Sequence, residues 1–191
     1  MAPDHPVARA AADAVALDPG DARAIARAWG AARDVAAGDV LLRPGERCRS
    51  MWFLESGTAR FYAEPDGRDV TRHFVRPGKV VTVLPAFASG GPSPEGVEML
   101  TAGRVLELSR ERAEALEAGC PAWAAFGAQT VREVYAYLDR ALDRARLLTA
   151  AERYAAFERD YPDVLLEVPL RHVASYLGMT PQSLSRVRAG R

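Results

Sequence analysis

The sequence predicts an α+β protein in which N-terminal helices precede an antiparallel β-sandwich or barrel, a long helix and a small all-α domain. Turn signals recur about every ten residues through residues 38–78, with short alternating or apolar segments between them. From residue 109 onward the apolar residues follow a helical period instead. Residues 170–191 contain two short helical patterns that meet at Gly178. A single sheet packed with helices is the alternative arrangement for the β region.

The first helical region is Ala-rich and covers residues 6–30, with Asp21 as a suitable N-cap and Gly30 as a stop signal. Strands are then expected between Gly-containing turns such as Gly57 and Gly78, because glycine tolerates the positive φ of tight turns. The expected strands are residues 40–43, 51–55, 58–64, 70–75, 80–84, 96–102 and 104–109.

A helix is expected from Ser109 to Gly119, followed by a helix of about 28 residues that begins with Pro121. The long helix carries an apolar heptad stripe, which predicts a coiled-coil dimer seam. The alternative is that this stripe packs on the chain's own sheet. The seam residues would be Val131, Val134, Leu138, Ala141 and Ala145.

The last domain is expected to start near Leu148. Thr149 and Glu152 have the spacing of a capping box, which predicts a new helix that Pro162 would end. The predicted domains are therefore residues 1–120 (N-terminal helices and β domain), 121–147 (dimerisation helix) and 148–191 (small α domain).

Charge is unevenly distributed along the 191 residues, although the formal net charge is zero. Residues 170–191 contain four arginines and no acidic residue, whereas the rest of the chain carries 21 basic and 25 acidic residues. A basic end on an acidic body is typical of an appended nucleic-acid-binding segment. The four arginines are Arg171, Arg186, Arg188 and Arg191.

Cysteine usage argues against several kinds of site. Cys48 and Cys120 are far apart and neither belongs to a CxxC motif, so a disulfide scaffold, a zinc finger and a cysteine-ligated cluster are poorly supported. The N-terminus lacks the pattern of a secretory signal, and no apolar run approaches the ~18 residues of a membrane span. A cytoplasmic protein without a membrane partner or a metal site is expected.

The two terminal helices have the features of a helix-turn-helix. Ala174 is a small residue where the second helix could cross the first, and Gly178 suits the turn. Thr180 can cap the second helix, with Pro181 at its first position. The shared core would be formed by Val173, Leu177, Met179, Leu184 and Val187.

The polar residues of the second helix then remain for solvent or DNA. Arginine can bond bidentately to guanine and glutamine to adenine in the major groove. The motif alone fits a purely structural helix pair equally well. The acid-free composition of this segment and the heptad helix before it favour double-stranded DNA as a partner. The predicted DNA-binding residues are Thr180, Gln182, Ser183, Ser185, Arg186 and Arg188.

Over residues 31–191 the chain resembles the Crp/Fnr family of bacterial transcription regulators. The resemblance is carried by residues 38–81, a Gly-marked β segment, and by residues 168–188, the helix pair. It implies a cyclic-nucleotide-binding-like jelly roll, a dimerisation helix and a C-terminal helix-turn-helix, here in a short form without a wing. The function implied is sequence-specific DNA binding by a homodimer, for which RNA polymerase would be a further partner.

The resemblance also assigns roles to positions of the second helix. Arg186 matches the family's base-reading arginine, and Gln182 stands where many members have a glutamate that contacts cytosine. Pro181 stands where some members have a first base-reading arginine, so that contact should be absent. Thr180 and Ser183 match hydroxyl positions that contact phosphate.

Cyclic AMP is not expected to bind. Members that bind it use a Gly-Glu pair and an arginine about ten residues later, but no arginine occurs between Lys79 and Gly103. A buried phosphate would lack its main charge-assisted contact. Gly90, Gly91 and Ser93 form a candidate effector loop, with a plain surface loop as the alternative. No cofactor is identified, and neither an iron–sulfur cluster nor haem is expected.

Enzymatic activity is not predicted. A jelly roll can host metal-dependent cupin enzymes, but those need several histidines, and His73 is the only histidine in the β region. No catalytic triad, P-loop or dinucleotide-binding motif is present in the sequence. The alternative function is a jelly-roll ligand-binding or cupin-like protein whose terminal helices only complete the fold.

Overall fold

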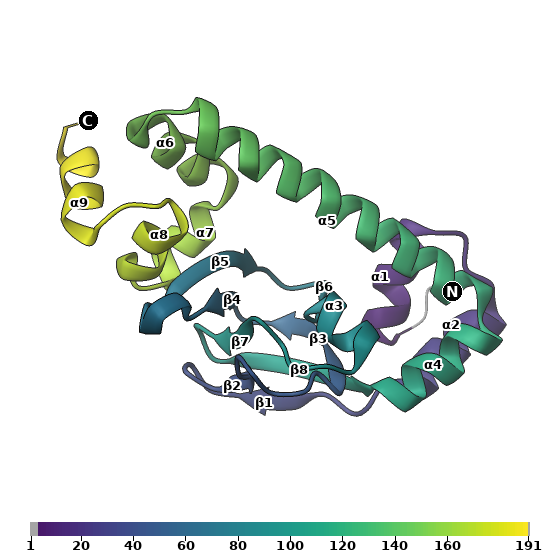
Figure 1. Ribbon diagram of the computed structural model, residues 1–191. Helices are drawn as coiled ribbons and strands as arrows, with labels where there is room; N and C mark the ends of the chain where they lie inside the picture. The colour runs from purple at the N-terminus through teal and green to yellow at the C-terminus, as the bar shows by residue number, and fades with distance from the viewer. Residues whose placement is uncertain (1–3, 191) are drawn as a thin grey trace.

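The computed structural model describes residues 4–190. A β-roll occupies the middle of the molecule, with N-terminal helices at one end and a small helical domain at the other (Figure 1). The long helix α5 (Pro121–Leu147) runs along the molecule from one end to the other. The fold therefore joins the two end regions both through the roll and through one continuous helix.

The roll consists of two four-stranded sheets in which every pairing is antiparallel, as predicted for a sandwich or barrel. The first sheet has the order β1-β8-β3-β6 and the second β2-β7-β4-β5. The strands are β1 (Arg33–Val35), β2 (Val40–Leu42), β3 (Ser50–Ser56), β4 (Ala59–Ala63), β5 (Val70–Val75), β6 (Lys79–Val81), β7 (Gly96–Met99) and β8 (Gly103–Ser109).

One local expectation for the roll needs correction. The strand expected at residues 80–84 ends at Val81, and the helix α3 (Leu84–Ser89) follows it, with Pro85 in its first turn. Proline suits a helix start because its missing N–H has no intrahelical partner there. The expected connection between β4 and β5 contains a short 3-10 turn, η1 (Pro65–Gly67).

The N-terminal region contains two helices within the predicted helical region, α1 (Pro6–Ala14) and α2 (Pro19–Ala28). The N-cap of α2 is Asp18 and not Asp21, because Asp18 accepts hydrogen bonds from the backbone of Gly20 and Asp21. Proline at position 19 can begin the helix one turn earlier than expected. The helix α4 (Arg110–Gly119) begins after Ser109, which caps it as predicted.

One apolar core fills the roll and extends under the N-terminal helices. Trp29, which follows α2, makes edge contacts with Phe53 of β3 and with Trp123 of α5, at centroid distances of 6.3 and 6.0 Å. Only the first turns of α5 are buried in this core, through Ala122, Trp123 and Phe126. Beyond this point α5 leaves the core.

The C-terminal domain has four helices, which surround a second apolar core that also includes Phe74 of β5. Thr149 and Glu152 form the predicted capping box at the start of α6. Pro162 does more than end α6, since it also begins α7, a helix that the sequence did not predict. The four helices are α6 (Ala150–Asp160), α7 (Pro162–Glu167), α8 (Leu170–Tyr176) and α9 (Pro181–Ala189).

Candidate nucleic-acid interface

The helices α8 and α9 meet in a tight turn at Gly178, whose φ is +67°. A side chain would be strained at this φ, so glycine suits the position. The turn is closed by the Met179 N–H, which donates to the Ala174 carbonyl at 2.9 Å. Ala174 is fully buried, and Leu184 of α9 is 1% exposed in the same core. The small crossing residue, the turn residue and the shared core thus lie where a helix-turn-helix needs them.

The first turn of α9 is stabilised by Thr180. Its hydroxyl oxygen accepts from the Ser183 N–H at 3.1 Å, and its hydroxyl donates to the Ser183 hydroxyl oxygen at 2.9 Å. Pro181 occupies the first helical turn. The cap therefore holds both hydroxyls at the exposed N-terminus of α9, where backbone N–H groups also favour an anion such as phosphate.

The exposed face of α9 carries Gln182, Ser185 and Arg186. Gln182 and Arg186 are four residues apart, so they lie one above the other on the same side of the helix. This side is opposite Leu184, which anchors α9 in the core. A long amide and a guanidinium are therefore presented together to the solvent, on a helix that is held rigidly from behind.

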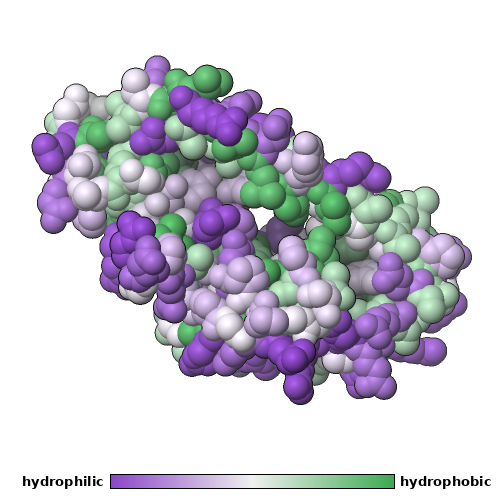
Figure 2. All heavy atoms as spheres, viewed as in Figure 1, coloured by the Kyte–Doolittle hydropathy of each residue, from purple (hydrophilic) through white to green (hydrophobic). Residues whose placement is uncertain are grey.

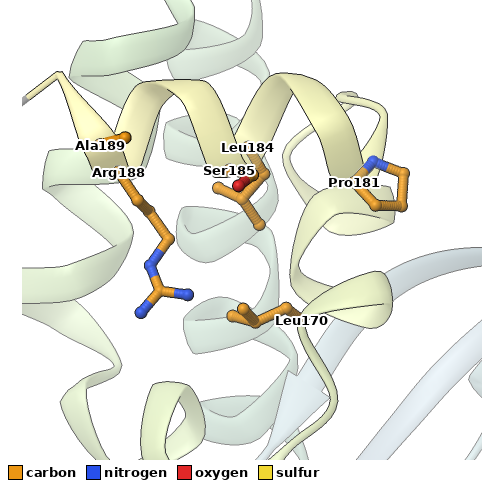
Figure 3. Close-up of a pocket in the computed structure, with 6 residues that line it drawn as sticks. All are labelled: Leu170, Pro181, Leu184, Ser185, Arg188 and Ala189. Carbon is orange, nitrogen blue, oxygen red and sulfur yellow. The ribbon is translucent and has the colours of Figure 1, made fainter.

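Arg188 lies on a different side of α9. Figure 3 shows its side chain beside a pocket of about 350 Å³, whose lining also includes Leu170, Leu184 and Pro181. At 100° per residue, Arg188 is turned well away from Arg186. The two predicted arginines thus do not form one surface, and Arg191 lies outside the described residues.

The C-terminal domain packs on the second sheet of the roll. The Thr71 N–H of β5 donates to the Ser175 hydroxyl of α8 at 3.0 Å, and the Thr58 hydroxyl donates to the Glu167 carboxylate at 3.3 Å. Phe74 of β5 belongs to the core of the C-terminal domain. Sequence reasoning missed this contact, because each of these residues is an ordinary strand or helix residue in its local pattern.

A charge cluster around the buried Arg60 supports the same surface of the sheet. Arg60 of β4 is 3% exposed and donates to Glu98 at 2.7 Å and to Asp69 at 2.6 Å. The hydrogen bonds from Arg60 hold the pKa of the Asp69 carboxyl below its usual range. The Asp69 carbonyl also accepts from the Ser175 hydroxyl at 3.4 Å, so this cluster borders the contact with α8.

Large apolar side chains are exposed along α5 after it leaves the core, as Figure 2 shows. Val131, Val134 and Leu138 of the predicted stripe are 46–50% exposed, so they do not pack on the chain's own sheet. Leu142, absent from the predicted set, is 47% exposed and continues the stripe, and Ala145 is exposed as well. Ala141 is half-buried and lines a cavity between α5 and the C-terminal domain.

The candidate effector loop is closed by bonds within the protein. Gly90 ends α3 with a φ of +71°, and its carbonyl accepts from Arg47 at 2.7 Å. The Ser93 hydroxyl donates to the Glu95 carbonyl at 2.6 Å, and Ser93 is 2% exposed. Gly91 donates its N–H to the Ser89 hydroxyl. The polar groups that could hold a phosphate in this loop are therefore largely engaged.

His73 lies between the roll and α5, near the Phe61 ring at 4.8 Å and the Tyr137 ring at 5.9 Å. Burial lowers its pKa to about 4, so it is neutral at physiological pH. Within residues 4–190, no three potential His, Cys, Asp or Glu ligands come together as a metal site would require. None of the described helices is both long and apolar enough to cross a membrane.

The β-roll is the part of the chain that matches a known protein family. Residues 32–118 match the family described as cyclic nucleotide-binding domain. No curated protein sequence is a significant match to this chain.

Solved structures extend the similarity to the rest of the chain. FixK2 from Bradyrhizobium japonicum is 21% identical with a TM-score of 0.70, covering 84% of this chain and 83% of that one. The c-di-GMP responsive global regulator CLP from Xanthomonas campestris is 18% identical with a TM-score of 0.71, covering 91% of each chain. The catabolite activator protein of Thermus thermophilus is 19% identical with a TM-score of 0.58, covering 92% and 84%.

The likeness to these regulators extends through α5 and the C-terminal domain, and it agrees with the resemblance found in the sequence. At sequence identities of 18–21%, this likeness shows the fold alone. Residues 32–118 thus match the cyclic nucleotide-binding domain family, and over most of its length the chain has the fold of the Crp/Fnr regulators.

Proposed function

We propose that the chain is a sequence-specific, DNA-binding transcription regulator of Crp/Fnr type that acts as a homodimer in the cytoplasm. The observation that carries this proposal is the geometry of α8 and α9. A capped, rigidly packed helix presents Gln182 and Arg186 side by side to the solvent. A helix of this kind fits the major groove of B-DNA, which is about 12 Å wide.

Each exposed residue of α9 then has a distinct role. Arg186 bonds bidentately to a guanine and Gln182 to an adenine one turn away. Thr180, Ser183 and the helix N-terminus contact phosphate oxygens, which position the helix without reading sequence. Ser185 borders this face, and Pro181 offers no donor. Because Arg188 points along another side, it contributes charge more than base recognition.

Dimerisation follows from the exposed face of α5. Val131, Val134, Leu138 and Leu142 form an apolar stripe that α5 of a second copy covers in a parallel coiled coil. Ala145 extends the stripe toward the C-terminal domain, whereas Ala141 lies at its edge. Two copies then present two α9 helices to successive major grooves of a two-fold-symmetric site.

The β-roll is the signal-receiving part, and it does not use cyclic AMP. The α3–β7 segment lacks an arginine, and the Ser93 hydroxyl is engaged with the Glu95 backbone. The protein acts through binding and not catalysis, and RNA polymerase is its further partner at promoters.

Selection from a random double-stranded DNA library tests this function. Several rounds of selection with the full chain should enrich a two-fold-symmetric sequence whose half-sites are about one helical turn apart. The parallel selection with Arg186→Ala should lose the preference at one position of each half-site. If neither protein enriches any sequence, the regulator assignment is wrong.

A further inference from the structure

A small cavity lies where α5 meets α6 and α8, outside both the roll and the helix-turn-helix surface. Its volume is about 110 Å³, whereas a single water needs only about 10–15 Å³. The polar side chains of its wall come from three helices: Tyr137, Arg140, Arg144, Asp160, Tyr161 and Tyr176. The cavity thus has room for a small polyatomic ion.

The cavity wall is positively charged. Arg144 and Asp160 form an ion pair at 2.6 Å, and Arg159 also binds the Asp160 carboxylate, at 2.9 Å. Arg140 has no hydrogen-bond or ion-pair partner within residues 4–190. The Asp160 carboxylate is therefore the only acidic group among the described residues of this wall, which has two guanidiniums, and it already binds Arg144 and Arg159. The donors of Arg140 remain for an anion.

Hydroxyl donors complete this wall. The Tyr137 and Tyr176 hydroxyls are 2.9 Å apart and share one hydrogen bond. The Tyr161 hydroxyl also bonds to Tyr137, and three hydroxyls joined by two hydrogen bonds keep one O–H free to donate elsewhere. Burial raises the pKa of Tyr137 and of Tyr176, so both remain protonated donors at neutral pH.

We propose that this cavity binds a small oxyanion of the phosphate type, held by Arg140 and by the Tyr137–Tyr176 hydroxyl pair. Planar guanidinium donors and hydroxyls suit the several oxygens of such an ion, and the size of the cavity excludes a whole nucleotide. The oxyanion is either free or the end group of a small metabolite that projects into solvent.

The position of the site gives it a regulatory consequence, which rests on the proposed function. Tyr137 belongs to the dimerisation helix, and Tyr176 lies two residues before the turn that leads to α9. An anion that binds both hydroxyls biases how the C-terminal domain sits on α5. It changes DNA affinity by the ratio of its affinities for the DNA-free and DNA-bound forms.

Isothermal titration calorimetry with the full chain tests the site, using sodium phosphate and glycerol phosphate against sodium chloride of equal ionic strength. Saturable binding with a Kd at or below about 1 mM is expected for one or both phosphate probes. The glycerol phosphate arm distinguishes an end group from a free ion. Heats that match the chloride control for both probes would overturn the proposal.

Two arginine variants make the test specific. Arg140→Gln should weaken binding at least about tenfold, since a charge-assisted hydrogen bond is lost. Arg146→Gln removes the same charge from an exposed site of α5 outside the cavity wall and should leave the Kd unchanged. Equal weakening by both variants would mean general charge attraction, which contradicts a built site. Tyr137→Phe, which removes one hydroxyl, should also weaken binding.

DNA binding is measured separately, at matched ionic strength. Saturating phosphate should shift the Kd for a selected DNA site in the wild type and not in Arg140→Gln. Arg140-dependent phosphate binding without such a shift would overturn the regulatory consequence and leave the site intact. If no DNA sequence is ever selected, the proposed function fails while the calorimetry still decides the site.

Discussion

Phe74 of the β-roll packs against Phe157 of the C-terminal domain, with ring centroids 5.7 Å apart and an edge-on geometry. Phe74 also lies 5.3 Å from the Tyr176 ring of α8. A residue of the roll thus completes the apolar core on which α8 and α9 rest. Together with the Thr71–Ser175 hydrogen bond, this contact ties the orientation of the α8–α9 pair to strand β5.

Phe74→Ala should destabilise the protein by about 3 kcal/mol, because it empties a buried position shared by two domains. Urea denaturation followed by circular dichroism measures this change. Leu166→Ala is the matched control, since Leu166 is an apolar C-terminal-domain residue that is 88% exposed. The control should stay within about 0.5 kcal/mol of wild type. Equal losses for the two variants would mean that Phe74 does not anchor the domain.

Leu138→Asp should convert the proposed dimer to monomers, because it places a charge in the middle of the exposed apolar stripe of α5. Light scattering measures the molar mass of the full chain. Arg132→Asp, at an exposed polar position of the same helix, should remain dimeric. A Leu138→Asp protein with an unchanged dimer mass would show that the subunits associate through another surface.

Stability should fall with pH between about 6.5 and 4, in part because of His73. Its folded-state pKa is about 4, whereas an unfolded histidine binds a proton near pH 6.5. The unfolded state therefore carries more protons in this window, and acid favours it by up to about 3 kcal/mol. His73→Gln should flatten the stability profile relative to wild type. Some pH dependence should remain in the variant, because it keeps His5 and His172, whose pKa values are also lowered by burial. Identical pH profiles from urea titrations would contradict a buried neutral His73.

Cyclic AMP at millimolar concentration should not raise the melting temperature. A ligand that binds the folded state stabilises it in proportion to the logarithm of its concentration over Kd. The α3–β7 segment offers neither an arginine nor a free Ser93 hydroxyl to the phosphate. A concentration-dependent rise with cyclic AMP, absent with AMP, would show that the roll binds the nucleotide in another way.

Local sequence patterns predicted much of the fold. The Gly-containing turns around Gly57 and Gly78 delimited strands correctly, and Thr149 with Glu152 marked the start of α6. The Thr180–Pro181 pair likewise located the first turn of α9. These signals are readable because caps and turns depend on residues only a few positions apart.

Long-range contacts were not predictable in the same way. The Phe74–Phe157 contact joins residues whose own patterns say only that each is apolar. Leu142 and Ala141 show the same limit, because a heptad count cannot tell which residue at the edge of a stripe turns toward a neighbouring helix. Helix geometry predicts that Arg188 and Arg186 point to different sides of α9. It does not predict that Arg188 lies beside a pocket that Leu170 also lines, because Leu170 belongs to another helix.

The affinity of the full chain for its selected DNA site, with and without Arg186, tests the central claim most directly. Fluorescence anisotropy at fixed salt should show that Arg186→Ala loses about 1–3 kcal/mol of binding to the selected site and little to a version altered at the guanine it reads. Arg188→Ala should weaken binding to both sites alike, because it removes charge and not a base contact. If Arg186→Ala binds the selected site as tightly as wild type, α9 does not read DNA through this residue.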